Sequence, residues 1–203
     1  MSLGITANRE KNGALLAYIA SNIPGINLRK LLKVVYLIDE QFMKLRGFPL
    51  TWFDYYAWAK GPVAPEVYDI KNLAFSDYVR CEKNEKGQHI VKAVLHHKYQ
   101  VLKQMDIFSP YEIEVVDDII ARYAPLSADE LSDLTHQDTS LWSRVVAEQH
   151  LSFDKRKTSD VRIPLTLLNE GDEEKQEIYQ DARWNMGFQA ALNQQSHHKR
   201  ISP

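Results

Sequence analysis

The chain has 203 residues, of which 44% are hydrophobic and 26% charged, a composition that favours one globular domain with a sizeable core. Its formal net charge of −2 excludes the basic surface with which a whole protein binds nucleic acid or acidic lipid. The single cysteine, Cys81, excludes an internal disulfide and a zinc site built from the cysteines of one chain, and we expect it to be a half-buried strand residue.

The N-terminal region predicts a helix and no leader. Its apolar run is too short to span a membrane, and acidic as well as basic residues precede it, whereas a signal peptide carries only positive charge there. We therefore expect a cytoplasmic protein without membrane contact. The helix covers residues 8–22 and ends near Ser21, because Pro24 and Gly25 stop it.

The clearest helix begins after Asn27, a favourable N-cap residue, and ends at Gly47. Asp39 falls close to its apolar face, where a carboxylate needs a partner, and Lys60 is one of several candidates. The apolar face consists of Leu28, Leu31, Leu32, Val35, Ile38, Phe42 and Leu45. We expect the core to include Leu31, Leu32, Val35, Tyr36 and Phe42.

Residues 51–60 are rich in aromatic side chains and predicted to be extended, because Pro62 after Gly61 disfavours a helix before it. The Gly61-Pro62 turn is expected to bring Trp58 and Tyr68 together. Another helix follows, and its first turn holds one of two prolines, Pro62 or Pro65. The apolar face of that helix continues through Val67, Ile70 and the residues Leu73 to Phe75.

The next elements are a hairpin and two helices. Two strand-like runs within residues 78–95 flank a charged turn in which Gly87 can adopt a positive φ. The two helices, separated at Pro125, each begin with a capping box: Ser109 with Glu112, and Ser127 with Glu130.

The last third of the chain predicts a short helix, an irregular segment and a final helix. The short helix covers residues 140–149, and a charged long loop or edge strand follows over 152–172. The final helix covers residues 172–195, and its register is set by Ile178, Ala182, Met186 and Ala190. Residues 197–203 are expected to be frayed.

These elements indicate a mainly α protein with a small antiparallel β element (α+β), a single compact helical domain with a β-hairpin. We expect residues 1–150 to form the main domain. Residues 151–203 would add the charged loop or edge strand and the C-terminal helix, packed on the same domain.

Motifs for catalysis and cofactor binding are missing. No glycine-rich phosphate loop, nucleophile elbow or zinc-binding pattern occurs, so we expect no enzyme, no cofactor and no metal site. A general base could be formed by His136 with Asp138, but no nucleophile is identifiable nearby and helix capping by Asp138 explains the pair as well. The adjacent pairs His96-His97 and His197-His198 are interpreted as surface histidines.

One basic run could touch phosphates. It lies within residues 154–162, where acidic residues interrupt it and no aromatic residue is interleaved, so we interpret it as a solvated loop. Its cations are Lys155, Arg156, Lys157 and Arg162.

Several blocks of the sequence resemble the Panacea domain, the SocA-like antitoxin family. They lie at residues 30–39, 47–50 and 57–68, with His136 and Trp142 downstream, and the resemblance covers about residues 14–146. The most specific block is "YAWAKGPVAPEVY". The motif residues, interpreted as structural, are Lys30, Leu32, Tyr36, Asp39, Pro49, Leu50, Ala57, Trp58, Gly61, Pro62, Val63, Tyr68, His136 and Trp142.

The resemblance implies a bacterial or phage-associated antitoxin that neutralises a cognate toxin, encoded nearby, by direct protein contact. The founding member is similar to an adaptor that hands its toxin to a protease, so one alternative is a proteolytic adaptor with residues 193–203 as a flexible tether. A nucleic-acid-binding regulator is another alternative, and it has the basic run as its only support.

Because the family serves unlike toxins, its shared motif is expected to hold the scaffold, and partner choice to lie on variable surface. The candidate partner-binding residues are Trp184, Met186 and Phe188 on the final helix, beyond the resemblance. For the two rings, four residues apart on one helical face, docking of that helix onto the domain is slightly favoured over partner binding.

Overall fold

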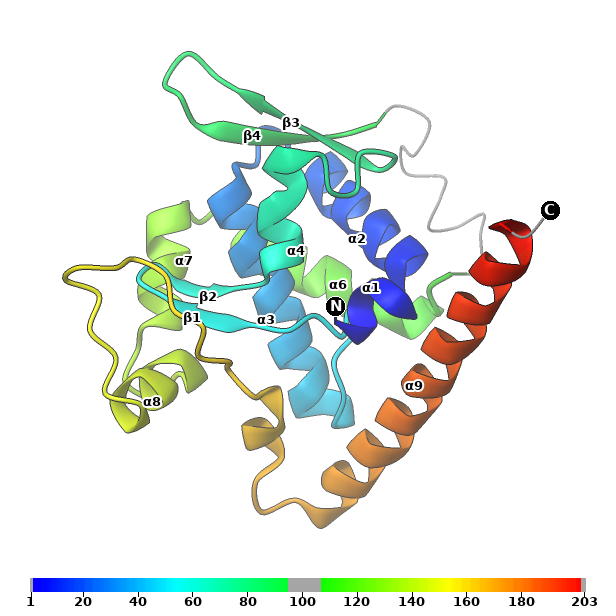
Figure 1. The fold of residues 1–203 in the computed structure, drawn as a ribbon. Coiled ribbons are helices and arrows are strands. Elements are labelled where there is room, and N and C mark those ends of the chain that lie inside the picture. The colour runs from blue at the N-terminus through cyan, green and yellow to red at the C-terminus, as the bar shows by residue number, and fades with distance from the viewer. Residues whose placement is uncertain (1, 95–106, 202–203) are drawn as a thin grey trace.

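The computed structural model describes residues 2–94 and 107–201, the last seven of them by their backbone alone. It is mainly helical, with two antiparallel two-stranded sheets (Figure 1), which confirms the predicted fold class. The helices are α1 (Leu3–Thr6), α2 (Arg9–Asn22), α3 (Leu28–Arg46), α4 (Pro65–Tyr68), α6 (Pro110–Tyr123), α7 (Ala128–Thr135), α8 (Leu141–Glu148) and α9 (Glu173–Ile201), with 3-10 turns η1 (Asp69–Asn72) and η3 (Leu165–Asn169). The strands are β1 (Tyr56–Trp58), β2 (Gly61–Val63), β3 (Val79–Lys83) and β4 (His89–Ala93).

Helix α3 forms the centre of the fold. The Asn27 side chain accepts a hydrogen bond from the Lys30 backbone N–H at 2.9 Å, and Gly47 ends the helix with φ 78°, as predicted. It contacts α6, α7, β2 and η3, which surround it in Figure 1. All five side chains expected in the core are buried. Leu45 is the exception on the predicted face: it is 47% exposed because the buried face ends one turn earlier, at Phe42 and Met43.

Replacing Leu32 with alanine should lower the free energy of unfolding by about 2–5 kcal/mol, because this 5%-exposed side chain lies in the core and its loss leaves a cavity. Urea unfolding of the variant measures the loss. Leu45→Ala on the same helix is the matched control and should cost less than about 0.5 kcal/mol. A loss that small for Leu32 would contradict the placement of α3 in the core.

The chain after β2 differs from the predicted long helix. Pro65 lies in the first turn of α4, as predicted for one of two prolines, whereas Pro62 lies in strand β2. The helical part ends at Asn72 because Leu73 takes φ 70° and Phe75 φ 57°, which reverse the chain. Leu73 is therefore exposed, and Phe75 alone of this pair returns to the core.

The second hairpin and the capping boxes follow the predictions. Strands β3 and β4 pair in antiparallel register with Gly87 at φ 73° in the turn, and half-buried Cys81 lies in β3. Both capping boxes are formed, at the N-termini of α6 and α7. Helix α8 lies within the predicted range 140–149.

The C-terminal part contains no edge strand among its described residues. Residues 152–172 form a loop that touches β1 through the isolated bridge between Tyr56 and Arg162 and ends in η3. Helix α9 then continues to Ile201, so the expected fraying from residue 197 is wrong, since no helix-breaking residue occurs before Pro203. The pair His96-His97 lies outside the described residues, and so do the side chains of His197 and His198.

Candidate functional site

The β1–β2 hairpin approaches helix α3 closely at Gly61. This residue has φ 99°, and a Cβ added there would lie 2.3 Å from Lys33 Nζ and 2.7 Å from Thr135 Oγ1. The buried Lys33 ammonium donates a hydrogen bond to the Pro62 carbonyl at 3.2 Å. Burial, and secondarily the charge of Arg29, lower the pKa of Lys33 to about 7. Glycine is therefore required for the hairpin to lie on α3.

Aromatic rings join this hairpin to its neighbours. The rings of Trp58 and Tyr68 meet edge to face with centroids 5.0 Å apart, which confirms that the Gly61-Pro62 segment brings them together. Trp142 on α8 donates its Nε1–H to the Trp58 carbonyl at 3.0 Å. The His136 ring stacks on Trp142 with centroids 3.9 Å apart. These contacts are those of a packed corner.

His136 has the environment of a packed side chain. Burial lowers its pKa, and Lys33 and Lys60 act in the same direction by charge, while Asp133 opposes them. Among the described residues, Nε2 of the ring is buried without a hydrogen-bond partner, and neither ring nitrogen bonds to a carboxylate. The general-base hypothesis, which requires a bonded carboxylate such as Asp138, gains no support from this geometry.

Asp39 is bonded to residues other than the proposed Lys60. Its carboxylate is fully buried and accepts hydrogen bonds from the Thr51 backbone N–H at 2.8 Å, from the Thr51 hydroxyl, and from the Tyr55 hydroxyl at 2.7 Å. Lys60 lies in the turn between β1 and β2, where its carbonyl accepts from Ser132 instead. Burial raises the pKa of Asp39 to about 6, against the opposing effect of the Thr51 and Tyr55 hydrogen bonds.

The other motif residues also lie in the interior or at its edge. Lys30 donates to the Ala124 carbonyl at 2.6 Å, and Tyr36 meets Tyr55 edge to face at 5.2 Å. The half-buried members are Trp58, Tyr68, His136 and Trp142. The buried members are Lys30, Leu32, Tyr36, Asp39, Pro49, Leu50, Ala57, Gly61, Pro62 and Val63.

One side of the motif block also faces an open groove of about 860 Å³. Trp58, Tyr68 and Phe153 line it, with Lys60 and Lys157 among the polar residues. Its polar groups are already bonded within the chain in two places, because Trp58 Nε1–H donates to the Ser159 carbonyl and Lys157 Nζ to the Phe153 carbonyl. No group of three or more His, Cys, Asp or Glu side chains that could hold a metal ion occurs in the described parts of the chain.

A model of the family described as antitoxin SocA-like, Panacea domain, matches residues 31–143, more than half of the chain. The chain belongs to this family. The match starts within α3, later than the resemblance in the sequence suggested, and the predicted domain limits stay a prediction. Comparison with curated proteins and comparison with solved structures each gave no match.

Helix α9 lies outside the matched Panacea domain and presents two different faces. On one, Tyr179 stacks on Trp52 with centroids 5.5 Å apart and Ala190 is buried, so that this face packs on the body near α1. On the other, Trp184 is 71% and Phe188 53% exposed. Their rings stack on each other, with centroids 5.9 Å apart and planes 2° apart.

The slight preference for docking by Trp184 and Phe188 is therefore wrong. The helix docks instead through the face that carries Tyr179, half-buried Met186 and Ala190, which lie at helical spacing on the side opposite the two rings. Of the three candidate partner-binding residues, Met186 belongs to the docking face and only the two rings are exposed.

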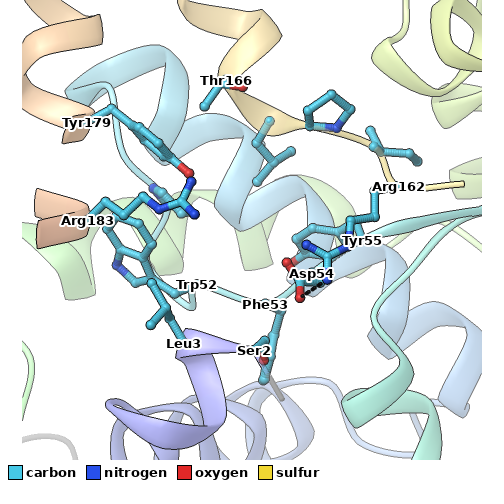
Figure 2. A pocket seen from close by; sticks show the side chains of 14 residues that line it. Ser2, Leu3, Trp52, Phe53, Asp54, Tyr55, Arg162, Thr166, Tyr179 and Arg183 are labelled. Atoms are coloured by element: carbon cyan, nitrogen blue, oxygen red, sulfur yellow. Dashed lines mark ion pairs between the residues drawn. The ribbon is translucent and has the colours of Figure 1, made fainter. Parts of the chain in front are cut away.

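A polar hollow of about 350 Å³ lies beside α9 and is bordered by residues 2–3, Pro49, residues 52–55 and 162–166, and Tyr179 and Arg183 of α9 (Figure 2). Figure 2 shows Trp52, Tyr179 and Arg183 on one side and the ion pair between Asp54 and Arg162 on the other. The ion-pair atoms are 3.2 Å apart. No sequence motif indicated this hollow, because its residues are far apart in the chain and only the docking of α9 brings them together.

Three of the four cations in the basic run have partners within the chain. Arg156 pairs with Asp160, Arg162 pairs with Asp54, and Lys157 donates to a carbonyl.

Within the described residues, no helix combines the length and the apolar character that a membrane span requires.

Proposed function

We propose that the chain is a non-catalytic antitoxin that neutralises a cognate toxin, encoded nearby, by direct protein contact. Its match to the antitoxin SocA-like Panacea domain over residues 31–143 carries this proposal. The packing of the motif residues supports a scaffold role for the matched part, because the polar side chains of Lys30, Asp39, Trp58 and Trp142 bond within the chain.

Co-expression tests the proposal. The protein and the product of the adjoining reading frame are expressed together and separately in a bacterial host. We expect that the neighbouring product alone arrests growth, that this chain restores growth, and that the two proteins co-purify in a defined ratio. Absence of both rescue and co-purification would overturn the proposal.

Two alternatives receive less support. A proteolytic adaptor was expected to use a flexible tether over residues 193–203, but α9 remains helical to Ile201. Nucleic-acid binding by the basic run would have to compete with the partners that three of its four cations already have.

The toxin-binding surface that we propose includes Trp184 and Phe188. Two large exposed rings side by side do not stabilise a monomer, and exposed apolar surface of this kind often marks a protein-binding site. Aromatic side chains are also enriched among the residues that dominate binding energy. The rings also lie outside the matched domain, where surface that differs between family members is expected.

Replacing Trp184 with alanine should weaken toxin binding about 30-fold or more, the loss of about 2 kcal/mol typical of an interface residue of this kind. The melting temperature should stay unchanged, because the ring is 71% exposed. Calorimetry and thermal unfolding measure the two effects. Gln180→Ala, one turn earlier on the same surface, is the comparison: it should leave the melting temperature unchanged and weaken binding much less than Trp184→Ala, because a small polar side chain is removed. A fall in melting temperature for Trp184→Ala would assign the ring to packing.

A further inference from the structure

We propose that the hollow beside α9 binds an acidic side chain, an aspartate or glutamate of the protein partner, next to the contact made by Trp184 and Phe188. This inference rests on the proposed function, since the partner is the toxin. It adds the chemistry that the partner must present.

The charges of the hollow favour a single carboxylate. Arg162 and Asp54 neutralise each other at 3.2 Å, whereas Arg183 forms no ion pair or hydrogen bond with the residues described for this chain. The hollow therefore carries one uncompensated positive charge. A guanidinium presents donors in the geometry of a carboxylate, which can accept two parallel hydrogen bonds from it.

A second observation comes from Ser2. Its side chain lies in the wall of the hollow, is 3% exposed, and its Oγ is buried without a hydrogen-bond partner among the described residues. A buried hydroxyl without a partner is unfavourable, and a carboxylate oxygen entering the hollow would accept its hydrogen bond. An acceptor in the hollow could therefore bond to both Ser2, whose hydroxyl can donate, and Arg183.

The remaining walls fit the stem of an amino-acid side chain. Leu3, Pro49 and Trp52 supply apolar surface, and about 350 Å³ is enough for a carboxylate with its methylene groups. A phosphate group is a poorer fit, because its charge of nearly −2 would meet one unpaired arginine beside the Asp54 carboxylate.

The hollow is continuous with the exposed aromatic pair. Arg183 lines the hollow and also borders the shallow surface formed by Trp184, Gly187 and Phe188. A partner that covers the two rings with an apolar surface therefore reaches Arg183 in the same contact. An acidic side chain at the edge of that apolar surface would enter the hollow.

The first test uses the proposed complex. Arg183→Gln should bind the adjoining-gene toxin about 10- to 100-fold more weakly than the unaltered chain, the loss expected for a charge-assisted hydrogen bond, and its salt dependence should be reduced. The melting temperature should not change. Arg156→Gln, which removes another exposed arginine that does not line the hollow, is the control and should bind as the unaltered chain does.

Equal binding by Arg183→Gln and the unaltered chain would overturn the inference while leaving the antitoxin function intact. A loss of binding accompanied by a lower melting temperature would assign Arg183 to the packing of α9 and would also overturn it. Failure of the unaltered chain to bind the toxin would instead count against the proposed function.

The second test needs no partner. The isotope-labelled protein is titrated with N-acetylglutamate and with its neutral counterpart N-acetylglutamine, and the indole N–H signals of Trp52 and Trp142 are followed by NMR. We expect N-acetylglutamate to shift the Trp52 signal, with no shift for Trp142, for N-acetylglutamine or in Arg183→Gln. Equal shifts with both probes, or no shift with either, would overturn the carboxylate site.

Discussion

Replacing Gly61 with alanine should destabilise the protein more than the same exchange at Gly25, Gly87 or Gly171, where an added Cβ would meet no atom within 4 Å. The backbone has φ 99°, which costs a residue with a Cβ about 1–2 kcal/mol. The new methyl group would in addition lie 2.3 Å from Lys33 Nζ and 2.7 Å from Thr135 Oγ1, a crowding that costs about 1–3 kcal/mol. We expect a total loss of about 2–5 kcal/mol in the free energy of unfolding.

The matched control is Gly87→Ala. Gly87 also has a positive φ, 73°, but a Cβ there has no atom within 4 Å. The free energy of unfolding of Gly87→Ala should therefore fall only by the cost of the positive φ, about 1 kcal/mol. Urea unfolding of both variants separates the two costs. Equal losses would show that Lys33 and Thr135 move aside, and that the close approach of the hairpin to α3 is not a constraint on residue 61.

Elements with local signals could be predicted from the sequence. The capping boxes of α6 and α7 and the Asn27 cap of α3 are formed within four residues of chain, so their residues alone determine the hydrogen bonds. The β3–β4 hairpin likewise depends on two short runs and one turn glycine. The family resemblance, which rests on spaced motifs, was confirmed for the same reason.

Features that depend on contacts between distant segments could not be predicted. Lys33 is buried where the β1–β2 hairpin covers α3, and no local pattern in the helix indicates that contact. Lys60 was named as one candidate partner of Asp39, but the Asp39 carboxylate accepts its hydrogen bonds from Thr51 and Tyr55. Helix α9 carries apolar residues on two faces, and periodicity does not decide which of them docks.

The same reasoning explains why the candidate site was found only in part. Trp184 and Phe188 were visible in the sequence as a pair at helical spacing, but their exposure follows from the packing of Tyr179 on Trp52. The hollow beside the two rings is lined by Ser2, Arg162 and Arg183, and these residues come from three distant parts of the chain. No composition or spacing rule brings them together.

Asp39 should make the stability of the protein depend on pH between about pH 4 and pH 6. Burial raises the pKa of this carboxyl from 3.8 to about 6 in the folded protein. Between these values the folded state binds more protons than the unfolded state, so the stability that the group contributes is fully present below pH 4 and is lost as the pH rises through 6. The loss amounts to about 3 kcal/mol, at 1.36 kcal/mol for each pKa unit.

Replacing Asp39 with asparagine should remove this dependence. The amide oxygen can accept from the Thr51 backbone N–H as the carboxylate does, and the amide nitrogen can donate to the Tyr55 or Thr51 hydroxyl oxygen, so most of the hydrogen bonds are retained without a charge. Urea unfolding of both proteins at pH 4, 5, 6 and 7 gives the difference in the free energy of unfolding. That difference, the unaltered chain minus Asp39→Asn, should fall by about 2–2.5 kcal/mol from pH 4 to pH 7, because the unfolded carboxyl is already more than half ionised at pH 4.

Asp160→Asn serves as the control for Asp39→Asn, because its side chain is 89% exposed and the substitution should change stability by less than about 0.5 kcal/mol at every pH tested. Taking differences between variants removes the contribution of every other titrating group that the proteins share. A constant difference between pH 4 and pH 7 would show that the hydrogen bonds from Thr51 and Tyr55 offset burial completely. A difference that rises with pH would reverse the sign and show that these bonds stabilise the ionised carboxylate by more than its desolvation costs.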